Sequence, residues 1–210
     1  SVYKNYPYFF AYSFAKDKAG HKIDAKSDLY IYFYFHALSL LNDKGSFCFI
    51  TSNSWLDVGY GSDLQEFLLK RCHVKLVLDN KARRCFKQAD INTVIVLLGP
   101  PGAPKISDEV SLDKTARFVM CYVPFEEILH PVVFEEIEEK QQRFSCQEYR
   151  IFPINQGQLL VHGCDVPDED KEESSALSVK APYAKIARYK YIGNKWGGKY
   201  LRAPDIYWTI

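Results

Sequence analysis

The chain has 210 residues, of which 47% are hydrophobic and 25% charged, a composition typical of a folded protein with one or two domains. The formal net charge of +1 excludes a uniformly basic coat for nucleic acid, so any contact with DNA must come from local charge separation. The histidines and cysteines lack metal-ligand spacing and the setting of a catalytic triad, so we expect reduced thiols and no metal or hydrolytic site. No apolar run reaches the roughly 18 residues of a membrane span, and we expect a cytoplasmic protein with no membrane partner.

The first elements in chain order are an irregular segment, a helix and a strand. Residues 1–26 mix aromatic residues with Lys, Gly and Asp and show no sustained period. A helix is expected to begin with Ser27 as its cap and to pack two neighbouring apolar stripes against a sheet. The stripes are Leu29, Phe33, Ala37 and Leu40, and Tyr30, Tyr34, Leu38 and Leu41. Residues 46–51 then predict a short buried strand.

A second helix and two strands follow. The helix should begin at Ser62, which has capping-box spacing with Gln65, and end near Cys72. Strands are predicted at 74–78 and 91–98. Helix, strand, helix, strand, strand is the second half of a doubly wound domain, so we predict the α/β class with a partial Rossmann-like sheet that ends in an antiparallel hairpin.

A smaller α+β region is expected after the Gly- and Pro-rich stretch 99–104. It contains a strand at 116–123, a Glu-rich helical stretch at 125–142 and a strand at 149–154. An acidic linker at 165–175 and a basic, aromatic tail complete the chain. The predicted units are therefore residues 1–104, 105–164 and 165–210.

Three segments together carry a resemblance to a known family. They are SDLYIYFYFHALSLL from Ser27, GSFCFITSNSWL from Gly45, and VLDNKARRCFKQADINTVIVLL from Val77. In this order and approximate spacing they resemble the second half of the catalytic domain of gamma-class adenine-N6 DNA methyltransferases, including the type IIG enzymes of restriction–modification systems. The later KYLRAPDIY is similar to a stretch near the start of the target-recognition region of such enzymes.

The resemblance implies S-adenosylmethionine as cofactor, double-stranded DNA as partner and an adenine flipped out of the duplex as substrate. It places Phe86 against the flipped base, although an aromatic plug between two strands is the structural alternative. It places Phe33 on the adenine of the cofactor, with burial of that ring against the sheet as an equal alternative. Asp28 and Tyr30 would line the cofactor cleft. Asn53 follows a strand whose carboxyl end is where open α/β sheets bind ligands.

Two motifs of the family are missing from the sequence. No acidic, Gly-rich cofactor turn precedes the Asp28-Leu29-Tyr30 triplet, and Asn5-Tyr6-Pro7-Tyr8 has only a passing likeness to the catalytic Asn-Pro-Pro-Tyr. We therefore name no catalytic residue. We expect a fragment that transfers no methyl group alone and whose partner is the missing N-terminal half of the same polypeptide.

The basic tail is a second functional candidate. Its predicted DNA-binding residues alternate with Tyr and Trp, as expected where phosphates are neutralised. They are Arg188, Lys190, Lys195, Lys199 and Arg202. A solvated face with a hydrophobic anchor is the alternative for the tail. For the whole chain, the alternative is a non-catalytic DNA- or protein-binding module on a degenerate methyltransferase scaffold.

Overall fold

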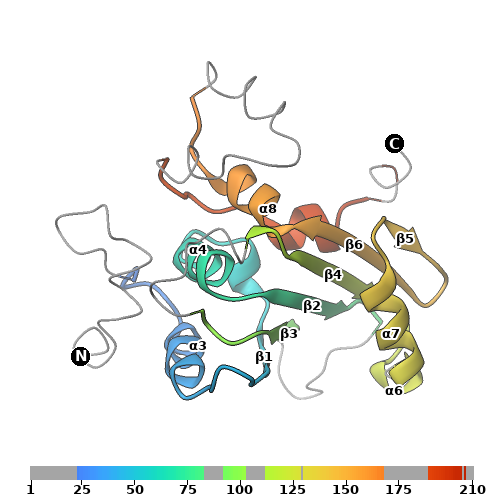
Figure 1. Ribbon diagram of the computed structural model, residues 1–210. Coiled ribbons are helices and arrows are strands. Elements are labelled where there is room, and N and C mark those ends of the chain that lie inside the picture. Colours follow the sequence, from blue (N-terminus) through green and yellow to red (C-terminus); the bar gives the residue numbers. More distant parts are fainter. Residues whose placement is uncertain are drawn as a thin grey trace.

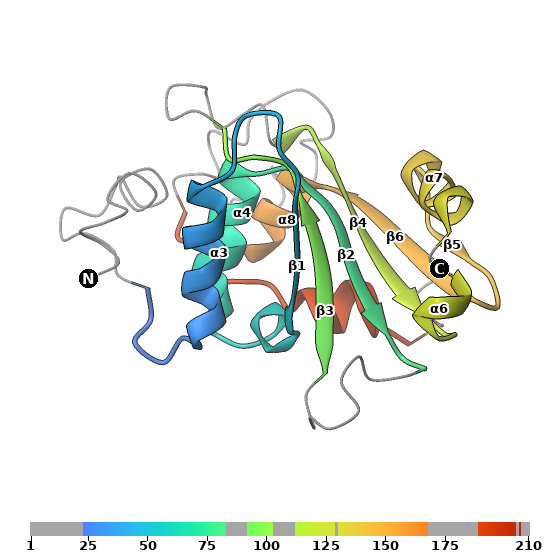
Figure 2. The ribbon, with the colours of Figure 1, turned by 90° about the horizontal axis from the view of Figure 1, so that it is seen from below.

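The computed structural model describes residues 23–82, 92–102, 112–128, 130–167, 189–204 and 206. These residues build one six-stranded sheet with helices on both of its faces (Figures 1 and 2). The strand order is β1-β3-β2-β4-β6-β5. The bounds are β1 Phe47–Ser52, β2 Val74–Asn80, β3 Thr93–Leu98, β4 Thr115–Cys121, β5 Phe144–Ser145 and β6 Tyr149–Asn155.

The directions of the strands define the edge of the sheet that matters below. β3 pairs antiparallel with β1 and β2, whereas β2 pairs parallel with β4. β6 pairs antiparallel with β4 and with the short β5. Consequently β1, β2 and β4 run in one direction and end at the same edge, which we call the carboxyl edge.

The two faces of the sheet carry separate hydrophobic clusters. The larger cluster lies under α3 Leu29–Ser39, α4 Gly61–Arg71, α8 Gln156–Gly163, the 3-10 turn η1 Ser54–Leu56 and the π-helical turn η2 Gly197–Leu201. The smaller cluster lies under α6 Phe125–Ile128 and α7 Pro131–Glu139. Both faces of the sheet are therefore covered, as an α/β domain requires.

The tail belongs to the larger core. Trp196 is fully buried, and its ring lies 5.7 Å from that of Trp55 and 5.6 Å from that of Phe118. Tyr200 packs on Phe118 from the same side, with 5.0 Å between the ring centroids. Such contacts between large buried rings stabilise the fold through apolar burial and edge-to-face geometry. The segment thus packs as part of the domain, and the strands of the predicted α+β region extend its sheet.

The predicted α/β class is confirmed, as are the two helices before the hairpin and the strands around 46–51, 74–78 and 91–98. The described residues also show β5 and α8, which the sequence did not suggest. The Glu-rich stretch is divided into α6 and α7, and Pro131 stands at the first position of α7. Proline is favoured there because it lacks the N–H that a helix interior needs.

Three local predictions were wrong. Asp28, not Ser27, is the N-cap of α3, and it makes no capping hydrogen bond with its side chain. Ser62 and Gln65 form no capping box, because Gln65 donates to the carbonyls of Trp55 and Leu56 and accepts from the tail. The Gln65 side chain thus bonds to residues outside its own helix and not to the helix N-terminus.

The third error concerns the face of α3 that is buried. Of the two stripes expected to pack on the sheet, the first lies outside, with Leu29, Phe33 and Leu40 exposed by 68%, 48% and 74%. Tyr34 and Leu38 of the second stripe are buried as expected. The buried residues of the helix are Ile31, Tyr34, Phe35 and Leu38. Because the helix is apolar nearly all round, its sequence could not determine which face meets the sheet.

Candidate functional site

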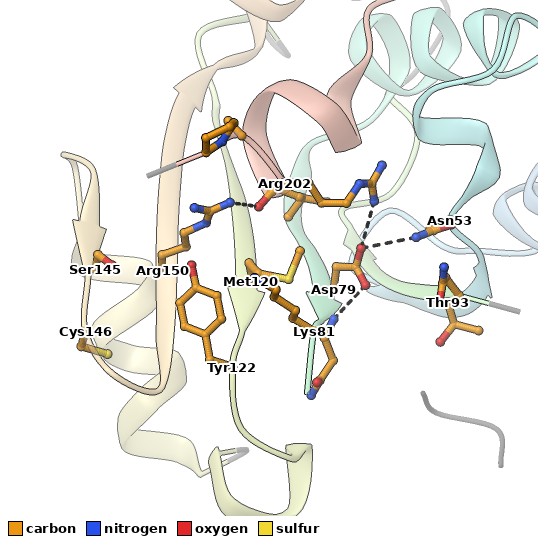
Figure 3. A pocket seen from close by; sticks show the side chains of 15 residues that line it. Asn53, Asp79, Lys81, Thr93, Met120, Tyr122, Ser145, Cys146, Arg150 and Arg202 are labelled. Carbon is orange, nitrogen blue, oxygen red and sulfur yellow. Dashed lines mark hydrogen bonds and ion pairs between the residues drawn. The ribbon is translucent and has the colours of Figure 1, made fainter. Parts of the chain in front are cut away.

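Polar side chains gather at the carboxyl edge of the sheet. Asn53 follows β1, Asp79 and Asn80 end β2, and Tyr122 follows β4. They line a pocket of about 760 Å³, shown in Figure 3. Carboxyl ends of parallel strands are the usual ligand-binding positions of open α/β sheets, so this edge is the candidate site.

Asp79 is the centre of the hydrogen-bond network in this pocket. Its carboxylate accepts from the Asn53 side-chain amide at 3.4 Å, the Arg202 guanidinium at 3.3 Å and the Asn80 backbone N–H at 2.8 Å. Only 5% of the residue is exposed, and this burial raises the pKa of its carboxyl above the usual range. The three donors oppose that shift because they stabilise the charged form.

Two further cations, Arg150 and Lys81, line the pocket near the Tyr122 ring. Arg150 is 4% exposed and donates to the carbonyl of Leu201, which ties β6 to the tail. The Arg150 guanidinium lies 5.9 Å and the Lys81 ammonium 6.0 Å from the centre of the Tyr122 ring. The pocket wall therefore combines cations from three different elements with one aromatic ring (Figure 3).

A second polar group lies at the N-terminal end of α3. The Tyr60 hydroxyl donates to Asp28 at 2.9 Å and lies 3.0 Å from the Tyr30 hydroxyl. Burial raises the pKa of both phenols, and the nearby Asp28 carboxylate adds to the shift in each. Tyr34 fixes the helix on the sheet, since its hydroxyl lies 3.3 Å from that of Thr51 in β1. Asp28 and Tyr30 are therefore held near the carboxyl end of β1.

The predicted cofactor residue Phe33 lies one turn farther along α3. Its ring is 48% exposed and is not buried against the sheet. Leu29 stands four positions before it and is more exposed still. The fold of the described residues therefore does not account for an aromatic ring at this position.

The predicted DNA-binding residues are in different situations. Phe86 and Arg188 lie outside the described residues. Lys190, Lys195 and Lys199 are exposed on the tail, while Tyr191, Trp196 and Tyr200 between them are buried. The three buried rings thus anchor the tail and leave its lysines on the exposed side. Arg202 is partly exposed and forms ion pairs with Asp57 and Asp79.

The sequence did not identify Asp79, Lys81, Arg150 or Tyr122 as site residues. Asp79 and Tyr122 follow apolar strand runs, a position that signals a ligand-facing residue in an open sheet. No such signal was available for Arg150, because its place beside β4 depends on the pairing of β6 with that strand.

No group of three or more His, Cys, Asp or Glu residues suited to a metal ion occurs in the described ranges. The five cysteines that lie in those ranges are free thiols. No helix among the described residues is both long enough and apolar enough to cross a membrane.

The first part of the chain matches a known protein family. Residues 5–86 match the model of the Eco57I restriction-modification methylase family. The resemblance to restriction–modification methylases is confirmed. The match ends at Phe86 and includes α3, β1, α4 and β2. The matched residues therefore form the N-terminal end of α3 and part of the carboxyl edge. No curated protein matches the chain.

Several solved structures are similar to the chain at low sequence identity. The type IIG restriction endonuclease BpuSI is 14% identical with a TM-score of 0.46, over 61% of this chain and 14% of its own. The M protein of the type I restriction enzyme EcoKI is 16% identical with a TM-score of 0.45, over 90% of this chain and 39% of its own. A type I modification subunit from Vibrio vulnificus is 13% identical with a TM-score of 0.42, over 66% and 29%. The chain thus spans well under half the length of each.

Proposed function

We propose that this chain is part of a site-specific DNA adenine-N6 methyltransferase of a type II restriction–modification system. The full polypeptide would transfer a methyl group from S-adenosylmethionine to an adenine flipped out of duplex DNA. The observation that carries this proposal is the family match over residues 5–86, because those residues build the N-terminal end of α3 and the strand ends that meet at the carboxyl edge.

The cofactor would be held at the N-terminal end of α3. The residues there suit it: Phe33 offers an exposed ring for stacking on an adenine, and Asp28 and Tyr30 offer hydrogen-bonding groups that Tyr60 holds in place. When bound, S-adenosylmethionine supplies an electrophilic methyl group on sulfur. The part of this chain in the reaction is to bind and orient the reactants.

The target adenine would lie against Phe86. This residue belongs to the connection between β2 and β3, which leaves the sheet after Lys81 and returns at Asn92. Both of these flanking residues line the pocket at the carboxyl edge. A base flipped from the duplex needs an aromatic or apolar surface on which to stack, and Phe86 would provide it.

The missing N-terminal half of the same polypeptide is the proposed partner. It would supply the Gly-rich cofactor turn and the Asn-Pro-Pro-Tyr motif, neither of which this sequence contains before α3. β1 pairs with β3 and with no second strand among the described residues, and Ile50 on it is 39% exposed. An open edge strand is a surface for further pairing. This chain alone would therefore transfer no methyl group.

The test is methylation of mixed-sequence duplex DNA with labelled S-adenosylmethionine by the full polypeptide and two variants. Phe86→Ala should abolish most transfer while cofactor binding is retained, because the stacking surface for the base is lost. Phe134→Ala removes a partly exposed ring from α7, on the other face of the sheet, and should leave transfer unchanged. Equal transfer by all three proteins would contradict the role of Phe86, and transfer by none would favour a non-catalytic binding module.

A further inference from the structure

The pocket at the carboxyl edge carries more positive charge than the proposed methyl transfer uses. Lys81, Arg150 and Arg202 line it, and Asp79 is the single carboxylate among the described residues of its lining. Asp57 is not among the lining residues and forms an ion pair with Arg202. Asp79 is itself covered by Asn53, Arg202 and the Asn80 N–H. The described lining residues therefore carry a net positive charge.

The strand ends that carry the pocket residues are fixed by hydrogen bonds of the fold. The Lys81 N–H donates to the carbonyl of Cys121 at 2.9 Å, which continues the pairing of β2 with β4. The Asn80 side chain donates to the carbonyl of Val123 at 3.0 Å and accepts from the Ala82 N–H at 2.8 Å. Because the backbone of this wall is already in place, binding there has a lower entropic cost than binding to an unordered loop.

Arg202 retains donors that can face a ligand. A guanidinium has five N–H groups. Arg202 uses one amino group on Asp79 and the other on Asp57, and its side chain remains 39% exposed. Guanidinium forks and ammonium groups together are the usual partners of phosphate oxygens.

We infer that this pocket binds a phosphodiester of the DNA strand next to the flipped nucleotide, through Lys81, Arg150 and Arg202. The inference rests on the proposed function, because it takes DNA as the substrate. It commits to DNA because the Phe86 connection leaves and re-enters the sheet at pocket residues Lys81 and Asn92. If a base of the DNA contacts the connection between β2 and β3, the sugar-phosphate backbone of that DNA strand would pass over the carboxyl edge. Contacts to phosphates position the duplex and read no sequence.

The experiment measures the affinity of the full polypeptide for a fluorescent 20-base-pair duplex at several salt concentrations. Lys81→Gln removes an exposed pocket cation that makes no side-chain hydrogen bond or ion pair within the described residues. Lys44→Gln is the matched control, since it removes an exposed lysine from the opposite edge of the sheet, before β1. Ser145→Glu places a carboxylate on the pocket wall from an exposed position.

Lys81→Gln should weaken binding about 3- to 10-fold near physiological salt and lower the slope of log affinity against log salt by about 1. The loss should be the same for duplexes of any sequence. Ser145→Glu should weaken binding at least as much, and Lys44→Gln should have no effect. The inference would be overturned if the salt slopes of Lys81→Gln and Lys44→Gln both equalled that of the unchanged protein. It would also be overturned if the unchanged protein did not bind the duplex.

Inorganic phosphate distinguishes the source of the bound group. In one outcome, inorganic phosphate at millimolar concentration saturates the pocket, and Lys81→Gln abolishes phosphate binding but leaves duplex binding unchanged. The pocket would then bind a free anion, and the DNA assignment would be overturned. The inference and the proposed function can fail separately. A reduced salt slope without methyl transfer would contradict only the function, and transfer with an unchanged slope would contradict only the pocket.

Discussion

The first half of the described chain, from α3 to β3, and the second half, from β4 to η2, share one sheet but differ in what their sequences reveal. The family match ends at Phe86, within the first half, whereas the packing continues from β2 to β4 without a break. Trp196 of the tail lies between Trp55 of the first half and Phe118 of the second. The segment that resembles the family is thus smaller than the unit that folds.

Two buried glutamines join these halves. Gln156 of α8 accepts from the Val74 N–H at 2.8 Å and donates to the carbonyls of Leu69 and Cys72. Gln65 of α4 accepts from the Tyr191 hydroxyl at 2.9 Å and from the Asn194 N–H at 3.0 Å. A buried group left without its partner costs about 1–3 kcal/mol, so these contacts specify how the halves fit together.

The largest expected effect comes from Trp196→Ala. The ring is fully buried between two others, and its loss should lower the free energy of unfolding by about 3–5 kcal/mol. Urea unfolding followed by circular dichroism measures the change. Ile192→Ala, at a residue of the same segment that is 56% exposed, is the control and should cost less than about 0.5 kcal/mol. A similar small loss for Trp196→Ala would show that the tail folds independently of the sheet.

A smaller effect is expected for Gly163→Ala at the end of α8. An added Cβ would lie 2.1 Å from the Tyr191 ring, so the ring must shift and its hydrogen bond to Gln65 must weaken. Overpacking of this kind should lower the free energy of unfolding by about 1–3 kcal/mol in the same assay. Gly59→Ala is the matched control, because an added Cβ there meets nothing within 4 Å. Equal stability of the two variants would mean that Tyr191 is not held against α8.

The smallest effect is a pH dependence at His73, which links the turn before β2 to β4. Its Nε2 lies 3.0 Å from the carbonyl oxygen of Thr115, and burial lowers the pKa of the ring below its usual 6.5. The unfolded chain therefore takes up this proton first as the pH falls. The stability that the neutral ring contributes is present above pH 6.5 and is lost as the pH falls towards the lowered pKa.

The free energy of unfolding, measured between pH 7.5 and about 5, should consequently fall by less in His73→Gln than in the unchanged protein, with a difference under about 1 kcal/mol. His130→Gln, at an exposed histidine on the other side of the sheet, should leave the pH profile unchanged. Identical profiles for all three proteins would exclude a contribution from His73.

The sequence predicted the elements of the first half because each has a strong local pattern, such as the β-branched run of β3. It failed where long-range packing decides. α3 is apolar on most sides, so the outward position of Phe33 followed from the contact of Tyr34 with Thr51 and not from periodicity. The carboxyl-edge pocket was missed for the same reason, since Arg150 reaches it only through the pairing of β6 with β4.

The most direct test of the methyltransferase assignment is the identity of the modified base. Duplex DNA would be incubated with the full polypeptide and S-adenosylmethionine, digested to nucleosides and analysed by mass spectrometry. We predict that N6-methyl-2′-deoxyadenosine is detected, and that it is absent when Phe86 is replaced by Ala. A methylated cytosine would contradict the adenine assignment, and unmodified DNA under conditions in which the cofactor binds would contradict the methyltransferase function itself.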